Sequence, residues 1–248
     1  MIRQIRTELR KQRTTGAAAA LAVAAVVIDV VVAATVLGGA GRQGNPPLGP
    51  DSLAQVIAGP ARALALICVL VGTLSVTGEY RHRTITTTFL AVPRRGRVVL
   101  AKVAGSALTG ASIGMGCVAA SLGVAVPWLR SAGVDVPAGS QEVRVAAGLV
   151  ASLALYGALG AAVGALVRHQ TAAAAGALAW LLAGEEVLAA VLAPAAFVHW
   201  LPVHAGAALV APPGTAGSSF WAAATALAGT VAALGVAGAQ LMRRRDVT

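Results

Sequence analysis

Six long apolar stretches alternate with shorter polar segments along the chain. A helix of about 20 apolar residues crosses the ~30 Å hydrocarbon core of a bilayer, and each stretch reaches about that length. The apolar residues run on without the strict alternation that marks the strands of a membrane barrel. The pattern therefore predicts an all-α membrane protein in which residues 16–248 form one domain with six transmembrane helices. The predicted spans are residues 17–37, 60–78, 98–126, 143–167, 171–193 and 220–242.

The first 15 residues have a different pattern, in which apolar residues recur at helical spacing among basic ones. Ile2, Ile5 and Leu9 fall on one side of a helix, and arginines surround them. A basic amphipathic helix of this kind lies in the membrane interface with its apolar stripe in the acyl boundary. We therefore predict an interfacial helix over residues 1–15. The alternative is a basic tail that only orients the first span.

The polar segments between the spans differ in character. Residues 38–59 and 127–142 are rich in glycine and proline, which predicts loops. Residues 79–97 are more polar, and we predict a loop that contains a short helix over residues 83–90. Residues 194–219 stay fairly apolar but are broken by prolines, which predicts a re-entrant segment that enters the membrane without crossing it.

Basic residues are distributed unevenly around the six spans. Most of the 19 arginines and lysines gather before the first span, between the second and third, between the fourth and fifth, and after the sixth. An even number of crossings separates these groups, so all of them lie on one side of the membrane. The positive-inside rule makes that side the cytoplasm. We expect a multi-pass protein of the cell membrane with both termini in the cytoplasm, and residues 194–219 on the outer side.

Composition supports the same assignment. Hydrophobic residues make up 57% of the chain and charged residues 11%, which is too apolar for a soluble domain. The net charge of +10 does not indicate nucleic acid, because the basic residues flank spans, where they set orientation and meet anionic lipid. Cys68 and Cys117 fall inside predicted spans, so we expect buried apolar side chains rather than a disulfide or a metal site.

Four ionisable residues lie inside predicted spans, and each is a functional hypothesis because burial of charge in lipid is costly. They are Asp29, Arg62, Glu185 and Glu186. At about 1.5 Å of rise per helical residue, Asp29, Arg62 and Glu185 reach similar heights in the outer half of the membrane. We therefore predict that Arg62 pairs with Asp29 or Glu185. The alternative is that Arg62 extends toward the outer interface while the acids face water-filled space.

Two catalytic patterns fail at the residues that matter. A phosphate-binding loop needs Gly-Lys followed by Ser or Thr, but Arg10 precedes Lys11 and Ala101 precedes Lys102. We therefore expect no catalytic residue and no cofactor in this chain, and any ATP and Mg²⁺ would belong to a partner subunit.

The second pattern is that of intramembrane metalloproteases of the prenyl-protein-processing type. Glu185 and Glu186 are followed by His199 and His204, but Ala190 occupies the position where that pattern has arginine. The histidines also lie in a proline-broken segment rather than on a clean helix. We therefore expect no metal site here, and an outer interfacial position for both histidines.

One polar segment and its surroundings resemble the type-2 ABC exporter permeases, in particular the bacterial half-sized membrane subunits. Members typically carry an E-Y-R-x-x-T-I run at the inner end of the second helix, then a P-x-R turn and an A-K pair at the start of the third. The matching residues here are Glu79-Tyr80-Arg81 with Thr84-Ile85, then Pro93-Arg94-Arg95, then Ala101-Lys102. Weaker agreement, mostly of hydrophobic pattern, extends over the rest of the chain.

The resemblance implies a definite assembly. Two permease subunits, identical or different, pair with two cytoplasmic ATPases and export an amphiphilic substrate such as a drug, peptide or lipid. The loop between helices two and three would carry a coupling helix that docks on the ATPase. The expected docking residues are Glu79, Tyr80, Arg81, Arg83, Thr84, Ile85, Pro93, Arg94 and Arg95.

The residues themselves are consistent with this role and leave alternatives open. Glu79 at the membrane edge can pair with Arg81 or Arg83 and so fix the loop against helix two. Arginines that only set topology would explain the charge of the loop, but not Glu79, Thr84 or Pro93. Two other functions compete with export: a membrane anchor or sensor for a cytoplasmic partner, and an ion-coupled carrier that uses Asp29 and Glu185.

Overall fold

The computed structural model describes residues 2–14, 16–42, 45–81, 95–136, 139–167, 169–191, 195–212, 215 and 217–244. Every regular element in this part of the chain is helical. Six helices are long and apolar enough to cross a membrane. They span Gly16–Gly39, Ser52–Arg81, Val98–Ser131, Ser140–Val167, Gln170–Val191 and Phe220–Leu241. The six predicted spans are therefore confirmed in number and order, with several of their ends displaced by a few residues.

The elements lie in the following order along the chain. The long helices are α2 (Gly16–Gly39), α4 (Ala61–Arg81), α6 (Arg95–Ser131), α7 (Ser140–Val167) and α12 (Phe220–Arg244). The fifth span combines α8 (Gln170–Ala179), a π-helical turn at Trp180–Gly184 and α9 (Glu185–Val191). The short helices are α1 (Ile2–Thr14), α3 (Ser52–Ala58), α10 (Ala195–Val198) and α11 (Pro202–Val210).

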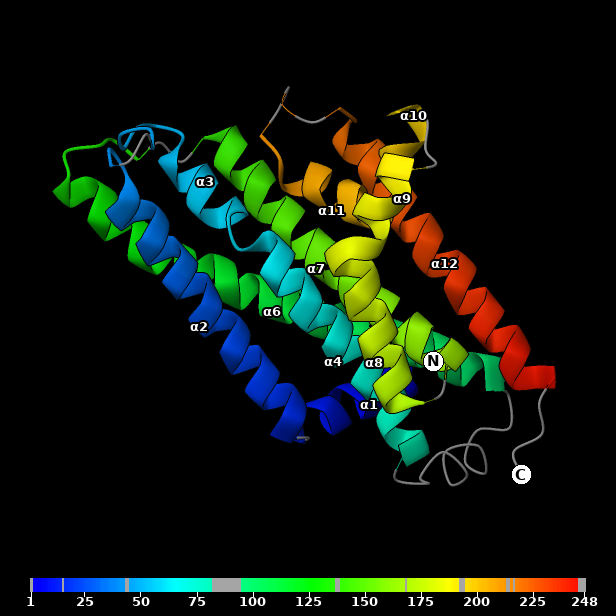
Figure 1. Cartoon of the computed structure of the whole chain (residues 1–248). Helices are drawn as coiled ribbons and strands as arrows, with labels where there is room; N and C mark the ends of the chain where they lie inside the picture. Colours follow the sequence, from blue (N-terminus) through cyan, green and yellow to red (C-terminus); the bar gives the residue numbers. More distant parts are fainter. Residues whose placement is uncertain are drawn as a thin grey trace.

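Helix α7 forms the centre of the bundle. It packs against α4, α6, α12 and α11, and Figure 1 shows it running between them. The helix backbones come close where glycines remove side-chain bulk: a Cβ on Gly160 of α7 would lie 2.1 Å from the carbonyl oxygen of Val69 on α4. Helix α2 and the α8–α9 span lie at the periphery, and large apolar side chains such as Val23 and Val187 are exposed there. An apolar periphery of this kind suits contact with lipid.

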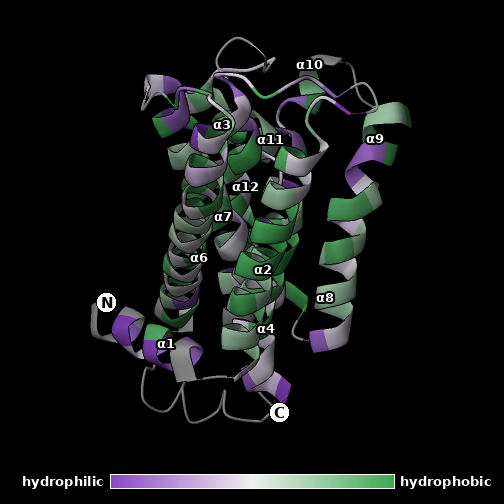
Figure 2. Ribbon diagram, turned by 90° about the vertical axis from the view of Figure 1, so that its left-hand side faces the viewer, coloured by the Kyte–Doolittle hydropathy of each residue, from purple (hydrophilic) through white to green (hydrophobic). Residues whose placement is uncertain are grey.

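The two ends of the bundle carry different elements. Figure 2 shows α1 at one end, and α3, α10 and α11 at the other. We call these the α1 end and the α3 end. The middle of the bundle is apolar, whereas hydrophilic residues gather toward both ends. The chain crosses the bundle six times after α1, so the last turn of α12 also lies at the α1 end.

Two predicted loops are shorter than expected. Residues 38–59, predicted as a loop, contain the helix α3, whose Leu53, Val56 and Ile57 are buried against its neighbours. Gly-Pro pairs stand at both ends of α3 and end the helix, but they do not disrupt its interior. The predicted loop over 127–142 is also wrong at its start, because α6 continues through Pro127 to Ser131. Neighbouring groups in a membrane bundle can compensate for the backbone hydrogen bond that a proline removes.

Three further predictions concern segments outside the six spans. A helix over most of residues 1–15 is confirmed by α1. The proline-broken segment after the fifth span contains α11, which begins with Pro202 in its first turn and packs against α7 and α12. The predicted short helix at residues 83–90 lies outside the described residues.

Cys68 and Cys117 are buried free thiols, as expected.

Candidate functional site

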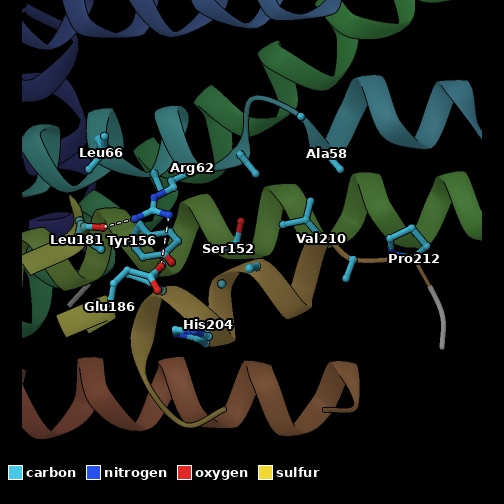
Figure 3. A pocket seen from close by; sticks show the side chains of 17 residues that line it. Ala58, Arg62, Leu66, Ser152, Tyr156, Leu181, Glu186, His204, Val210 and Pro212 are labelled. Atoms are coloured by element: carbon cyan, nitrogen blue, oxygen red, sulfur yellow. Dashed lines mark hydrogen bonds and ion pairs between the residues drawn. The ribbon is translucent and has the colours of Figure 1, made fainter. Parts of the chain in front are cut away.

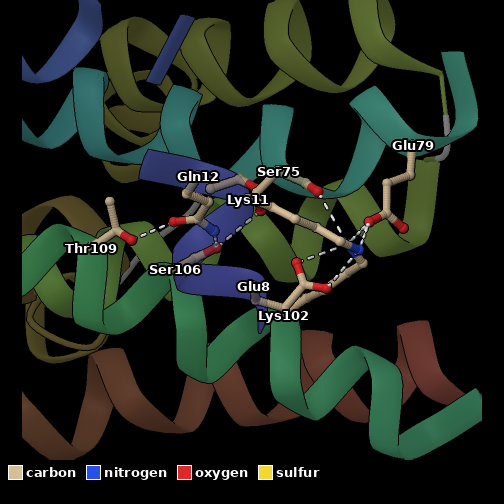
Figure 4. Close-up of polar contacts among 9 residues, drawn as sticks. Glu8, Lys11, Gln12, Ser75, Glu79, Lys102, Ser106 and Thr109 are labelled. Carbon is tan, nitrogen blue, oxygen red and sulfur yellow. Dashed lines mark hydrogen bonds and ion pairs between the residues drawn. The ribbon is translucent and has the colours of Figure 1, made fainter. Parts of the chain in front are cut away.

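A largely buried cluster of two carboxylates and two ammonium groups joins three helices at the α1 end. We call it the α1-end ion cluster; its members are Glu8, Lys11, Glu79 and Lys102 (Figure 4). The Lys102 Nζ lies 2.9 Å from Glu79 Oε1 and 3.2 Å from Glu8 Oε2. The Lys11 Nζ lies 2.9 Å from Glu79 Oε1 and 3.4 Å from Glu8 Oε1. The only two lysines of the chain thus bind the same two acids.

Polar groups around the cluster extend it along α4 and α6. The Lys102 ammonium also donates to the carbonyl oxygen of Ser75, 3.2 Å away. The Ser75 and Ser106 hydroxyls lie 3.0 Å apart, and Gln12 Nε2 donates to Ser106 Oγ at 3.2 Å. The Thr109 hydroxyl donates to Gln12 Oε1. Helix α1 is therefore attached to the bundle by a continuous polar network and not by apolar contacts alone.

The local sequence of α1 explains why it can insert two polar side chains. Ile5, Glu8, Leu9 and Gln12 follow the i, i+3, i+4, i+7 spacing of one helical face. Glu8 and Gln12 are each only 6% exposed. Sequence reasoning missed both residues. A single acid on the apolar stripe of an otherwise basic helix is the signal that could have identified Glu8.

The predicted pairing of Glu79 with Arg81 is not found. Arg81 Nη1 instead donates to Gln170 Oε1 at 3.3 Å, on the exposed side of α4. Tyr80 is half-buried and packs beside Val76, Val99 and Ala165. The lysines bind Glu79 because α1 and α6 bring them to its buried side, whereas Arg81 lies further round the helix.

Several predicted docking residues fall outside the described residues: Arg83, Thr84, Ile85, Pro93 and Arg94. Arg95 begins α6, and its side chain is not among those described. We call the segment between α4 and α6 the connector. The described structure gives its two ends, at Arg81 and Arg95, and the docking role of the residues between them stays a prediction.

The charge state of Lys11 follows from its place in the cluster. Partial burial alone would lower the pKa of its ammonium group. The hydrogen bond to Glu79 and the negative charge of Glu8 outweigh this effect and raise the pKa above its ordinary value. Lys11 therefore stays protonated throughout the physiological pH range.

A second polar region lies at the α3 end, around a cavity of about 420 Å³. Residues from α3, α4, α7, the π-helical turn, α9 and α11 line it. Figure 3 shows Arg62, Tyr156, Glu186 and His204 on one side, and Ala58, Val210 and Pro212 on the other. We call it the α3-end cavity. Its volume lies in the range of about 300–1,000 Å³ that is typical of small-molecule sites.

The charged side of this cavity is built around the π-helical turn. Arg62 Nη2 donates to the carbonyl oxygens of Leu181 and Leu182, at 3.2 and 3.1 Å. Arg62 Nη1 lies 3.5 Å from Glu186 Oε1. The Trp180 ring covers Gly184, where a Cβ would lie 2.9 Å from a ring atom, so a larger residue there would displace the ring. π-helical turns inside α-helices are frequent at functional sites.

Glu185, next to the cavity, has a separate role as a cap for α11. Its carboxylate accepts from the backbone N–H groups of Val203 and His204, at 2.8 and 2.9 Å. His204 Nδ1 lies 2.8 Å from the same carboxylate, and Glu185 is only 1% exposed. A carboxylate at a helix N-terminus satisfies free N–H groups and interacts favourably with the helix dipole. His204 is therefore a partner of Glu185 and not only an interfacial side chain as predicted.

The prediction that Arg62 pairs with Asp29 or Glu185 is wrong, because its ion pair is with Glu186. Asp29 is fully buried and instead accepts from Ser121 Oγ, at 2.9 and 3.1 Å. The depth of each residue was estimated, but depth does not determine the side of the helix on which a residue lies. Asp29 shares a face of α2 with Ala25 and Ala33, and this face packs against α6, not toward Arg62.

Comparison with known proteins adds no identification. The chain matches no protein-family model, and no curated protein sequence matches it. The resemblance to the exporter permeases therefore rests on the residues quoted from the sequence.

Proposed function

We propose that this chain is the membrane-spanning permease subunit of an ATP-driven exporter of the type-2 ABC family. In this role it couples ATP hydrolysis by a separate cytoplasmic ATPase to the efflux of an amphiphilic substrate. ATP and Mg²⁺ bind to the ATPase, and a second permease subunit completes the path. The support comes from the motif residues at 79–102 and from the geometry of the α1 end.

The single observation that carries the proposal is the position of the α1-end ion cluster. Glu79 stands at the end of α4 and Lys102 near the start of α6, on either side of the connector that would hold the coupling helix. Their side chains lie 2.9 Å apart, and the Lys102 ammonium also lies 3.2 Å from Glu8 of α1. A push on the connector would then move α4, α6 and α1 as one rigid body, which is what transmission of ATPase closure requires.

The surroundings of the cluster fit a cytoplasmic location. The basic residues of α1 and the last turn of α12 lie at the same end as the cluster, which the positive-inside rule assigns to the cytoplasm. Helix α1 then lies along the inner membrane surface, where Arg6 and Arg10 meet anionic lipid headgroups. The segment containing α10 and α11 becomes the outer re-entrant element.

The contacts inside the spans favour export over an ion-coupled carrier. A carrier needs acids that are free to bind and release an ion. Glu185 instead accepts from two backbone N–H groups of α11. Asp29 is fully buried against Ser121. Both acids join helices, so they serve the packing of the bundle.

The proposal is tested by reconstituting the chain with the ATPase encoded nearest to its gene. We expect a stable complex whose ATP hydrolysis increases in the presence of an exported amphiphile. Replacement of the connector arginines with R94Q/R95Q should weaken complex formation, whereas R42Q, at the other end of the bundle, should not. A complex that forms but never responds to any amphiphile would favour an anchor or sensor. Labelling of the connector from outside intact cells would exclude the proposal.

A further inference from the structure

The α3-end cavity holds two opposite charges that remain open to a ligand. Arg62 and Glu186 are each 52% exposed, although both line the cavity. Their closest approach, 3.5 Å, is long for a charge-assisted hydrogen bond, which is usually about 2.7–2.9 Å. A pair this loose loses little when a ligand separates it, because half-exposed ion pairs contribute little free energy.

The other polar groups of the cavity already have partners within the protein. The Tyr156 hydroxyl donates to the carbonyl oxygen of Pro202 at 3.0 Å, and His204 Nδ1 lies 2.8 Å from Glu185. The Ser152 hydroxyl donates to the carbonyl oxygen of Leu149 at 3.0 Å. Arg62 also donates from Nη2 to the carbonyl oxygens of Leu181 and Leu182. Because Arg62 and Glu186 carry full charges and are still half-exposed, they are the two groups that would select the charge of a ligand.

The rest of the lining is apolar and built from small side chains. Ala58, Val210 and Pro212 lie on the side away from the charged pair (Figure 3). Ala65 and Ala207 also contribute to the wall. Small side chains leave the space open, and the surface they present suits an alkyl group. The cavity thus combines a dipolar end with an apolar end.

We propose that the α3-end cavity binds a small zwitterionic amphiphile, with its anionic group at Arg62, its cationic group at Glu186 and its tail along the apolar side. A ligand with a single negative charge gains from Arg62 but is opposed by Glu186. A ligand with a single positive charge meets the reverse combination. A zwitterion matches both residues and adds no net charge to the site. This inference goes beyond the proposed function, because binding by the chain alone needs no ATPase.

Binding of three matched probes to the purified chain in a maltoside detergent tests the inference. The probes are an alkylphosphocholine, an alkyl methyl phosphate diester and an alkyltrimethylammonium of one chain length, each titrated by calorimetry below its micelle concentration. We expect the phosphocholine to bind about fivefold more tightly than either singly charged probe, since each half-exposed ion pair contributes up to about that factor.

Two substitutions should exchange the preference in opposite directions. E186Q leaves the positive charge of Arg62 unopposed, so the alkyl methyl phosphate should become the tightest ligand. R62Q should make alkyltrimethylammonium the tightest ligand. The control R42Q makes the same chemical change at the same end of the bundle but outside the cavity, and it should keep the preference of the unmodified protein. A role in packing alone would not produce this exchange.

A207F provides an independent test, because a phenyl ring at this position takes up space in the cavity and should weaken binding of all three probes. Equal affinities of the unmodified chain for the three probes would overturn the inference. So would substitutions at Arg62 and Glu186 that change all three affinities alike. If R62Q does not fold, E186Q decides the question, because it replaces one half-exposed oxygen and keeps the shape of the side chain.

Discussion

At the α1 end, Lys102 leaves 1% of its side chain exposed between Glu8 and Glu79. At the α3 end, Arg62 and Glu186 each leave 52% exposed beside a cavity. Both regions pair charges carried by separate helices, but only the first buries most of them: Lys102, Glu8 and Glu79 are at most 11% exposed, whereas Lys11 remains accessible. The α1-end ion cluster joins α1, α4 and α6. Arg62 and Glu186 are accessible, and each can bind a charged group of a ligand in place of the other.

The energetic difference follows from burial. Removing one member of a buried ion pair leaves an uncompensated charge and costs about 3–5 kcal/mol, whereas an exposed pair contributes about 0–1 kcal/mol. The α1-end ion cluster is therefore expected to behave as a structural joint. The charged pair of the α3-end cavity is expected to matter for what binds and little for folding.

The largest expected effect is that of K102M, which removes the buried ammonium between Glu8 and Glu79. Both carboxylates would then lose their buried positive partner, and stability should fall by about 3–5 kcal/mol. The measurement is the thermal unfolding midpoint in detergent, followed by size-exclusion chromatography.

K11M is the matched control for this prediction. Lys11 contacts the same two carboxylates, but its side chain is 45% exposed. The loss should therefore be at most about 1 kcal/mol. Equal midpoints for the two variants would show that burial does not set the strength of the cluster, and the contrast between the two ends would lose its basis.

The next largest effect tests the same contrast within two adjacent residues. E185A removes the carboxylate that accepts from the backbone N–H groups of Val203 and His204. Leaving these groups without a partner should cost about 1–3 kcal/mol and open the start of α11. Hydrogen–deuterium exchange of residues 203–204 should accelerate along with the fall in midpoint.

Its control is E186A, which alters the exposed member of the Glu-Glu pair. Surface substitutions of this kind usually change stability by less than about 0.5 kcal/mol, and exchange at α11 should not change. If E186A destabilised the protein as much as E185A, the pair of Arg62 and Glu186 would be structural and the binding role of the cavity would be weakened.

The sequence predicted the parts of the fold that depend on composition along one helix. Length and hydropathy identify a span directly, so the six spans were correct in number and order. Helix α3 was missed because the glycines and prolines at its ends look like loop signals, while its apolar interior is only seven residues long. Helix length and turn chemistry compete in such short segments, and packing against α7 decides the outcome.

The candidate sites were less predictable, because they depend on how helices rotate and cross. Arg62 was expected to pair with an acid at similar depth, but depth does not tell on which side of its helix a residue lies. After the π-helical turn, Glu186 and not Glu185 faces Arg62. Lys102 was part of the motif, but its partner Glu8 lies 94 residues away along the chain. Contacts between distant segments of this kind leave no periodic signal in a single sequence.

The smallest expected effect on stability is that of R81Q, and it separates docking from folding at the α1 end. Arg81 is exposed at the end of α4 and donates one hydrogen bond to Gln170. Its replacement should change stability by less than about 0.5 kcal/mol. The affinity for the ATPase subunit should nevertheless fall severalfold, because the charge stands on the surface beside the connector.

K102M should impair binding only as far as it unfolds the chain. The unfolding midpoint and the ATPase affinity, measured on the same preparations, show whether each residue acts in folding or in docking. A midpoint as low as that of K102M would make Arg81 part of the structural joint, and an unchanged affinity would remove it from the docking surface.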